Sequence, residues 1–332
     1  MPPSMSSMPL VAAVRDAQSL LGRYLPTTRL VEAPSLRRFA GGNVYLKLES
    51  ELPTSSFKPR GALCALTVKV SRQKIREVVA SSTGNHGAAV AYAARLLGVK
   101  ATIFLPSNPN PVKRARITAL GAAVVEEGMS DLAAAFRRAS DYAQADGVYF
   151  LNDATDADLP AGPGTIACEI FDALPDASAI YVPMGDTALI RGVASAAKQI
   201  SPRVRIVGVQ AERAPSYYLS WKEGRVVTTD TCDTIADGLA TRTPEAPNVE
   251  EIRRLVDDVR LVTEKQMLAA IWHLLVEEHV VAEPAGAAAT AAIMNSQEKV
   301  GGKVVALVTG ANVTPAVLQM AAREAEVHSG SR

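Results

Sequence analysis

The chain has 332 residues and a formal net charge of +1, with 48% hydrophobic and 21% charged residues. This composition excludes a mainly disordered chain, and the length suggests about two domains. The balanced charge gives no electrostatic attraction for nucleic acid or an anionic membrane, and the apolar runs are too short to span a bilayer. The amino terminus lacks the pattern of a secretory signal, and the three separated cysteines favour neither disulfides nor zinc. We therefore expect a cytoplasmic protein without nucleic-acid or membrane partners.

Short apolar runs, many of them rich in β-branched residues, alternate with helical patterns along the chain. Strands are predicted at residues 43–48, 77–80, 101–105, 122–125, 148–151, 179–182, 205–209 and 303–308. Helices are predicted at residues 87–97, 131–145, 189–198 and 264–278, and the polar, proline-rich stretch 241–251 is predicted as a surface loop. This alternation is typical of an α/β fold with a mostly parallel sheet.

Small polar residues follow three of these strands. They lie in the segments 81–87, 183–189 and 309–312. Ligands of open α/β sheets bind beyond the carboxyl ends of the strands, and the first two loops lead into helices, whose amino termini offer N–H groups to anions. A single loop of this kind more often serves only as a helix cap. Together they predict one ligand with more than one anionic group.

A fourth segment, S-S-F-K-P-R-G-A at residues 55–62, places Lys58 between an aromatic residue and a proline. The pattern S-F-K-x-R-G-A resembles the Schiff-base lysine motif of fold type II pyridoxal-phosphate enzymes, in particular the serine/threonine dehydratase and serine racemase family. The resemblance covers residues 20–320 approximately, and further motifs follow in the family's order: S-T-G-N-H-G from Ser82, A-G-P-G-T from Ala161, T-I-A-D-G up to Gly238, A-E-P-A-G-A around Glu283, and T-G-A-N from Thr309.

The resemblance implies a tryptophan synthase β-like fold. Two open, mostly parallel, twisted sheets flanked by helices are expected. A large cofactor-binding domain would comprise residues 1–70 and 150–332, and a small domain would comprise residues 71–149. Because members of the family are commonly dimers, a homodimer is expected, with a small amino acid as its substrate.

The resemblance also implies the residues that bind pyridoxal 5'-phosphate. Lys58 would form the covalent link and take the α-proton of the substrate, and burial is expected to lower the pKa of its amine. Phe57 would pack on the ring, Asn85 would bind the ring 3'-oxygen, and Thr309 would meet the pyridine nitrogen. The remaining cofactor residues would be the phosphate loop and two neighbours: Gly185, Asp186, Thr187, Ala188, Leu189, Gly238 and Glu283.

The substrate is expected to lie between two loops. Backbone N–H groups of residues 82–86 would hold its carboxylate, and Thr83 would be a second catalytic residue, able to move a proton. The full set of substrate residues is Ser82, Thr83, Gly84, Asn85, His86 and Ala154. The implied reaction is β-elimination from a 3-hydroxy amino acid to a 2-keto acid and ammonium. Threonine-synthase-like chemistry, β-replacement, racemisation or a silent binding protein remain alternatives.

The chain departs from the family's pattern at several positions, one of them Thr83, which stands where serine racemase has a serine. The tetraglycine phosphate loop reads G-D-T-A, which puts Asp186 beside the phosphate. Gln210 and Ser216 stand where related enzymes have acidic metal ligands, so no metal is expected. Residues 152–154 read N-D-A in place of H-P-x, and the side chains at Leu52, Ser55 and Pro163 are also unusual. These pocket changes predict a substrate bulkier than serine or threonine.

Overall fold

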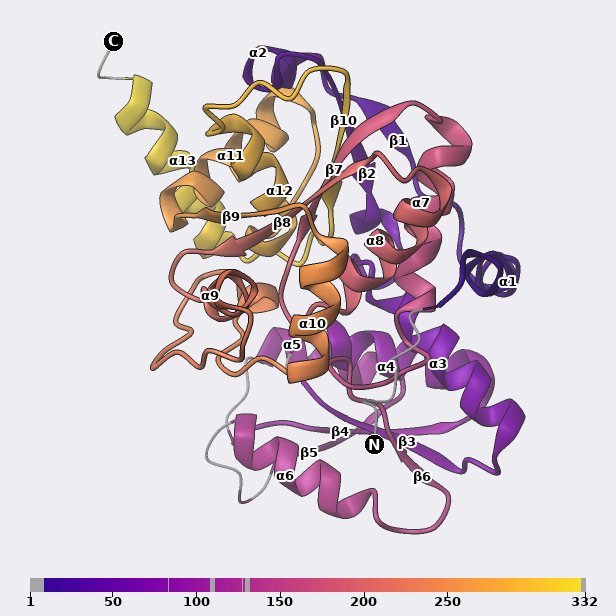
Figure 1. The fold of residues 1–332 in the computed structure, drawn as a ribbon. Coiled ribbons are helices and arrows are strands. Elements are labelled where there is room, and N and C mark those ends of the chain that lie inside the picture. The colour runs from indigo at the N-terminus through magenta and orange to yellow at the C-terminus, as the bar shows by residue number, and fades with distance from the viewer. Residues whose placement is uncertain (1–8, 83, 108–110, 127, 129–131, 330–332) are drawn as a thin grey trace.

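The computed structural model describes residues 9–82, 84–107, 111–126, 128 and 132–329. It contains two separate sheets (Figure 1). The larger sheet has six strands, parallel except for the antiparallel pair β1–β2. Its strands in spatial order are β1 (Leu30–Glu32), β2 (Asn43–Leu48), β10 (Lys303–Val308), β7 (Ala177–Pro183), β8 (Arg205–Ala211) and β9 (Asp258–Val262).

The smaller sheet has four parallel strands and lies below the larger one in Figure 1. In spatial order they are β5 (Ala123–Val125), β4 (Lys100–Phe104), β3 (Glu77–Ser81) and β6 (Val148–Phe150). All four therefore come from one continuous stretch of chain, inserted between β2 and β7. The division into domains at residues 70/71 and 149/150 stays a prediction.

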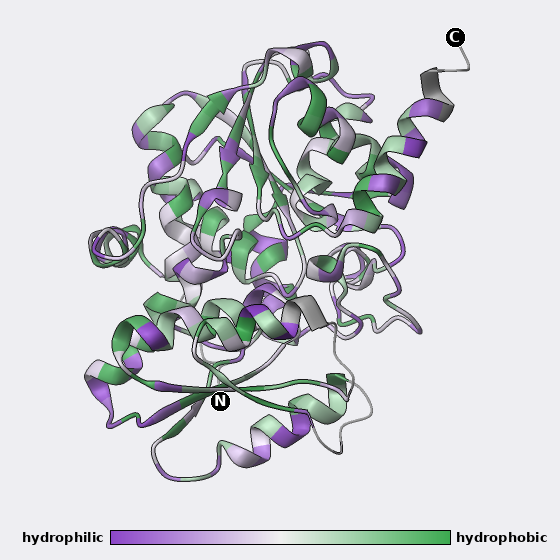
Figure 2. Cartoon of the chain, turned by 180° about the vertical axis from the view of Figure 1, so that it is seen from behind, coloured by the Kyte–Doolittle hydropathy of each residue, from purple (hydrophilic) through white to green (hydrophobic). Residues whose placement is uncertain are grey.

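Helices connect the parallel strands and cover both sheets, as an α/β fold requires. Their bounds are α1 (Val11–Leu21), α2 (Arg37–Ala40), α3 (Lys58–Arg72), α4 (Asn85–Leu97), α5 (Pro111–Ala119), α6 (Leu132–Tyr142), α7 (Ala161–Ala173), α8 (Ala188–Ile200), α9 (Ser216–Glu223), α10 (Ala246–Leu255), α11 (Glu264–Glu277), α12 (Pro284–Met294) and α13 (Pro315–Ser329). Figure 2 shows the hydrophobic residues gathered along the strands and on the helices that pack against them.

The expected α/β class with mostly parallel sheets is confirmed. Two strands were not predicted, and both lie at edges of the larger sheet. β1 has only three residues, and β9 contains the charged residues Asp258 and Arg260 among its apolar residues. The surface loop predicted at 241–251 is wrong in its second half, where α10 begins. Pro247 occupies the first turn, where its missing N–H leaves no bond unmade, and the helix buries Val249 and Ile252.

Helix α12 contributes to one of the two core clusters of the larger sheet and also positions the site. Its residues from Pro284 to Ile293 are buried, and most are alanine. Such small side chains permit close packing: a Cβ on Gly286 would lie 2.3 Å from the carbonyl oxygen of Gly310. The amino end of α12, with Glu283 before it, therefore lies directly against the end of β10.

The described ranges contain no helix that is long and apolar enough to cross a membrane. The two residues at the positions of the family's metal ligands bind other parts of the protein. Gln210 Oε1 accepts a hydrogen bond from the Tyr218 N–H at 2.9 Å, and the Ser216 hydroxyl donates to the Thr241 carbonyl at 2.6 Å. These contacts give both side chains a structural role.

Candidate active site

Lys58 is the first residue of α3, at the carboxyl edge of the six-stranded sheet. The segment before it runs beside the end of β10: the Ala311 N–H donates to the Ser55 carbonyl at 2.9 Å, and the Phe57 N–H donates to the Thr309 carbonyl at 3.0 Å. Phe57 lies next to the amine, with Lys58 Nζ 5.4 Å from its ring centroid. The backbone pairing thus fixes Lys58 at the end of a central strand, where ligands of α/β sheets bind.

A buried ionic network anchors the same helix. Arg60, which is 2% exposed, donates to Glu49 at 2.7 and 3.0 Å and to Glu169 at 2.7 and 2.9 Å. Lys47 Nζ lies 2.5 Å from Glu169 and also donates to the Thr28 carbonyl. The positive charges of Arg60 and Lys47 thus balance the negative charges of Glu49 and Glu169, and Arg60 lies close to Lys58 in the same helix.

Asp153 reaches the Lys58 amine from the loop after β6. Its Oδ2 lies 2.5 Å from Lys58 Nζ and 3.6 Å from His86 Nδ1. Burial lowers the pKa of Lys58, but the negative charges of Asp153 and Asp186 outweigh burial and raise the pKa above lysine's usual value. The expectation that burial lowers the pKa of Lys58 is therefore wrong for this structure, because an unforeseen carboxylate faces the amine.

Asn85 and Glu283 meet on the other side of the site. Asn85 Nδ2 donates to Glu283 Oε1 at 2.6 Å, and Asn85 Oδ1 accepts from Asn312 Nδ2 at 2.5 Å. Asn312 also donates to the Thr54 carbonyl and accepts from Arg116. These contacts connect α4 and α5 of the smaller sheet to the end of β10, so the site lies where the two sheets meet.

The loop from Gly185 to Leu189 begins α8. Thr187 precedes the helix with φ +70°, and no described side chain caps the start of α8. The first N–H groups of a helix have no partner within the helix, so those of α8 can bind another group. Asp186 Oδ1 accepts from the Thr241 hydroxyl at 3.0 Å. Burial, together with the charge of Asp153, raises the pKa of Asp186. A raised pKa favours the neutral carboxyl group, which is compatible with an anion at this helix terminus.

Gly185 is closely packed, which leads to a prediction. A Cβ at this position would lie 2.2 Å from the Gly238 carbonyl oxygen, so Gly185→Ala must move backbone. Because overpacking costs about 1–3 kcal/mol, we expect cofactor affinity to fall about tenfold or more, measured by fluorescence titration with pyridoxal phosphate. Gly22→Ala is the control, since its Cβ would meet nothing closer than 3.4 Å. Equal affinity of both variants would contradict the prediction.

The raised pKa of Asp186 predicts a pH-dependent stability. A carboxyl group with a higher pKa in the folded chain stabilises the fold at low pH and loses that contribution as pH rises through the folded pKa. Asp186→Asn should therefore raise the Tm of the apoprotein at pH 8 by about 2–4 °C, the shift that roughly 1 kcal/mol produces. The gain should vanish near pH 4.

Asp172→Asn is the control in the same thermal unfolding series, because the pKa of Asp172 is shifted in the opposite direction to that of Asp186. A hydrogen bond from Arg15 lowers the pKa of Asp172, so this carboxylate stabilises the fold above its unfolded pKa. Asp172→Asn should not gain stability at pH 8. A pH-independent Tm difference for Asp186→Asn would contradict the assignment.

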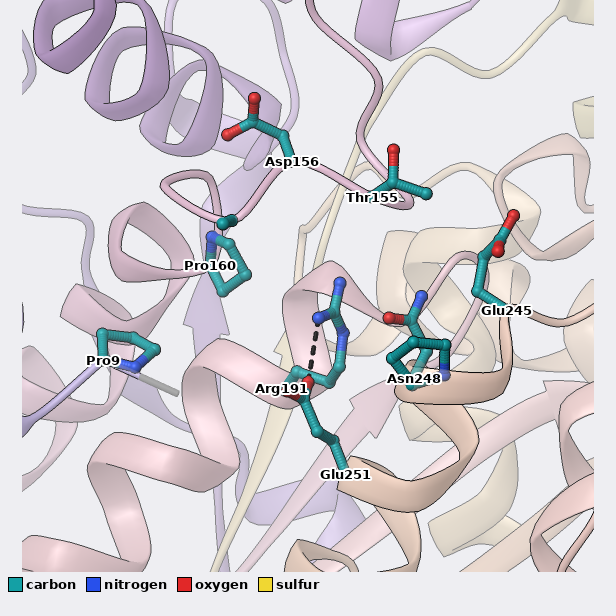
Figure 3. A pocket seen from close by; sticks show the side chains of 10 residues that line it. Pro9, Thr155, Asp156, Pro160, Arg191, Glu245, Asn248 and Glu251 are labelled. Carbon is teal, nitrogen blue, oxygen red and sulfur yellow. Dashed lines mark hydrogen bonds and ion pairs between the residues drawn. The ribbon is translucent and has the colours of Figure 1, made fainter. Parts of the chain in front are cut away.

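A separate cavity of about 260 Å³ lies beside the loop that carries Asp153 (Figure 3). The Arg191–Glu251 ion pair, 2.9 Å long, lies at this cavity. Arg191 also donates to the Ala154 carbonyl at 3.1 Å and to the Thr187 hydroxyl at 3.2 Å. The cavity is lined by Pro9, Thr155, Asp156, Ala157, Pro160, Arg191, Glu245, Pro247, Asn248 and Glu251, none of them a predicted cofactor residue. Its arginine holds two loops of the site in place.

Most of the predicted site residues converge in space. Phe57 and Lys58 lie beside Thr309, Asn85 contacts Glu283, and Gly185 packs on Gly238. The remaining residues lie at helix starts or in loops. The Gly84 N–H donates to the Ser82 hydroxyl, and His86 donates to the Leu151 carbonyl. Ala188 and Leu189 are buried in the first turn of α8, and the Ala154 carbonyl accepts from Arg191. Thr83 lies outside the described residues.

Three contributors were missed: Asp153, Thr241 and Asn312. Asp153 and Asn312 stood in segments already singled out, the N-D-A departure and the last loop, which was the available signal. Thr241 lay in the stretch taken for a surface loop.

The family model described as pyridoxal-phosphate dependent enzyme matches residues 23–310. The chain belongs to this family. Its cofactor is pyridoxal phosphate, and the residues of the site fit it: the Lys58 amine at a strand end lies within the electrostatic reach of Asp186, in the loop that begins α8, and no described side chain caps that helix start.

Individual relatives agree with this assignment. The chain is 35% identical over 319 residues to L-threonine ammonia-lyase of Thermotoga maritima, covering 96% of this chain and 79% of the relative. It resembles the processed threonine deaminase isoform 2 of Solanum lycopersicum with a TM-score of 0.89 and 30% identity, covering 95% and 88% of the two chains. Maize serine racemase gives a TM-score of 0.87 at 27% identity, covering 98% and 100%.

Proposed function

We propose that this chain eliminates water from L-threonine or a closely related 3-hydroxy amino acid, leaving a 2-keto acid and ammonium. The reaction class is β-elimination, and the protein is a pyridoxal-phosphate-dependent lyase. The observation that carries the substrate proposal is Lys58 at the end of β10, in a chain similar to enzymes named L-threonine ammonia-lyase and threonine deaminase.

The cofactor, when bound, draws electrons away from the substrate's Cα. Lys58 is proposed to hold it and then to take the proton from Cα. Its amine must first lose a proton, which the neighbouring carboxylates oppose because they favour the ammonium form. The loop at residues 185–189 would bind the phosphate through N–H groups, and Asn85, Phe57 and Thr309 would contact the ring. Residues 82–86 would bind the substrate carboxylate.

The test is a product assay on the purified, cofactor-loaded protein. L-threonine should give 2-oxobutanoate and ammonium in equal amounts, and L-serine should give pyruvate. Interconversion of L- and D-isomers without keto acid would replace the proposal by racemisation. 3-Phenylserine belongs in the same series, since the pocket departures predict acceptance of a bulkier substituent.

We also propose a homodimer that resides in the cytoplasm. Cys64, Cys168 and Cys232 are free thiols, as in proteins of a reducing compartment. Exposed apolar side chains on and next to the packed helices α11 and α13, namely Val276, Val281 and Met320, support contact with a second chain. Sedimentation analysis should give about twice the mass of 35.0 kDa; a single-chain mass would contradict the dimer.

A further inference from the structure

Asp153 is a rigidly held carboxylate at the reacting centre. The Asn152 side chain accepts from the Ala154 N–H at 3.1 Å, and the Ala154 carbonyl accepts from Arg191 and from Asn248. Asp153 is therefore flanked on both sides by anchored residues. Its side chain is only 15% exposed, so water contributes little to its solvation.

The ligand that Asp153 binds in this structure is a primary ammonium group. Its Oδ2 accepts a hydrogen bond from Lys58 Nζ at 2.5 Å. His86 Nδ1, at 3.6 Å, is too far for a hydrogen bond, and its Nε2 donates to the Leu151 carbonyl. Burial raises the pKa of Asp153, but His86 and Lys58 lower it further, so that the net pKa lies well below the usual value. In this structure, with the Lys58 ammonium beside it, Asp153 is therefore an anion.

Loading the cofactor removes this ammonium partner. A free lysine ammonium has three N–H donors, whereas a lysine nitrogen bound to a carbonyl carbon keeps at most one. Asp153 is then a nearly buried carboxylate beside Lys58, the residue proposed to take the proton from Cα. A buried carboxylate without a cation or hydrogen-bond donors is costly, so a ligand that supplies an ammonium group there gains affinity.

We infer that Asp153 is a specificity-determining residue which binds the substituent on the substrate's Cβ, and that the chain accepts 2,3-diamino acids, whose Cβ carries an ammonium group. This inference deepens the proposed function and rests on it for the elimination chemistry. The probe is L-2,3-diaminopropionate, the smallest member of this class.

The elimination balances without a further reactant except water. Lys58 takes the proton from Cα, the Cα–Cβ double bond forms, and the Cβ–N bond breaks with its electron pair going to nitrogen, so that the β-ammonium leaves as ammonia. The released 2-aminoacrylate takes up one water to give pyruvate and a second ammonia. A hydroxyl group must gain a proton to leave as water, whereas the ammonium group needs none. A β-ammonium group would take the place of the lysine cation beside Asp153 and keep this carboxyl group ionised, so the site suits an ammonium leaving group better.

The first arm of the test measures kcat/KM of the loaded enzyme for L-2,3-diaminopropionate and L-threonine. Asp153→Asn should lower the value for diaminopropionate at least about tenfold relative to the value for threonine, because hydrogen bonds to charged groups contribute about 1.5–3 kcal/mol. Asp158→Asn is the matched control: it removes the same charge from the same loop, but contacts Lys69 at 3.4 Å and Arg72 at 3.6 Å. Equal ratios in both variants would overturn the inference.

The second arm measures binding without turnover. Cofactor-loaded Lys58→Ala should bind L-2,3-diaminopropionate at least about tenfold more tightly than L-alanine, which lacks only the β-ammonium, by calorimetry. Adding Asp153→Asn should abolish that preference, and Asp153→Glu should restore part of it. No preference in Lys58→Ala would overturn the inference. If no substrate yields keto acid, the proposed function fails, and this arm decides the role of Asp153 by itself.

Discussion

Lys58→Ala is expected to abolish both the covalent attachment of the cofactor and the turnover of substrate. The amine is the group proposed to bind the cofactor and to move the Cα proton, and alanine can do neither. General base catalysis alone contributes about 10²–10⁴-fold, so kcat/KM should fall at least about a hundredfold. The absorbance band of the attached cofactor, recorded together with keto-acid release, checks both effects on one sample.

Lys69→Ala is a suitable control for this experiment. Lys69 lies on the same helix, contacts Asp158 at 3.4 Å and lies 5.4 Å from the Tyr149 ring centroid. The change removes the same side chain from α3 without reaching Asp153, so band and turnover should persist. Full activity in Lys58→Ala would show that another residue holds the cofactor. Loss of both signals in the two variants would indicate damage to α3 and not to the chemistry.

Arg60→Met should destabilise the fold more than any of the other substitutions. It leaves the buried carboxylates of Glu49 and Glu169 with Lys47 as their remaining cation. Removing one partner from a buried ionic network costs about 3–5 kcal/mol, because the remaining charge stays unsolvated. Since whole domains are stable by about 5–15 kcal/mol, urea unfolding of the apoprotein should show a markedly lower midpoint.

Arg15→Met separates this effect from the loss of an ordinary ion pair. Arg15 binds Asp172 at 2.5 Å, but the side chains are 41% and 51% exposed. Exposed pairs contribute about 0–1 kcal/mol, so this variant should unfold close to the parent. Comparable losses in the two variants would mean that the buried network is worth no more than a surface contact.

The strands of the interior were predictable because they are rich in apolar residues, continuously so in β10 and with Lys47 as an interruption in β2. β2 and β10 lie at their predicted residues, and both are almost fully buried. The edge strand β9 was not predictable in this way, since its half-exposed residues include Asp258 and Arg260. The start of α10 was mistaken for a loop because its residues are mostly polar, although Pro247 is a residue that suits a first helical turn.

The members of the site were predictable from motifs, but their pairings were not. Lys58 and Asp153 are 95 residues apart in the chain, and nothing in either segment encodes their contact. The pKa of Lys58 was therefore expected to be lowered, because burial was foreseen. It is raised, because the nearby carboxylate of Asp153 was not foreseen. Asn312 shows the same limit, because its partners Thr54 and Asn85 come from two different loops.

The anchoring of the loop around Ala154 bears on how this protein can diverge. Arg191 and Asn248 hold that loop through a main-chain carbonyl, which every amino acid possesses. Mutations at positions 153 and 154 can therefore alter what the reacting centre recognises while the loop keeps its path. Single substitutions at these two positions can therefore change substrate preference during evolution, while Lys58 and helix α3 stay the same.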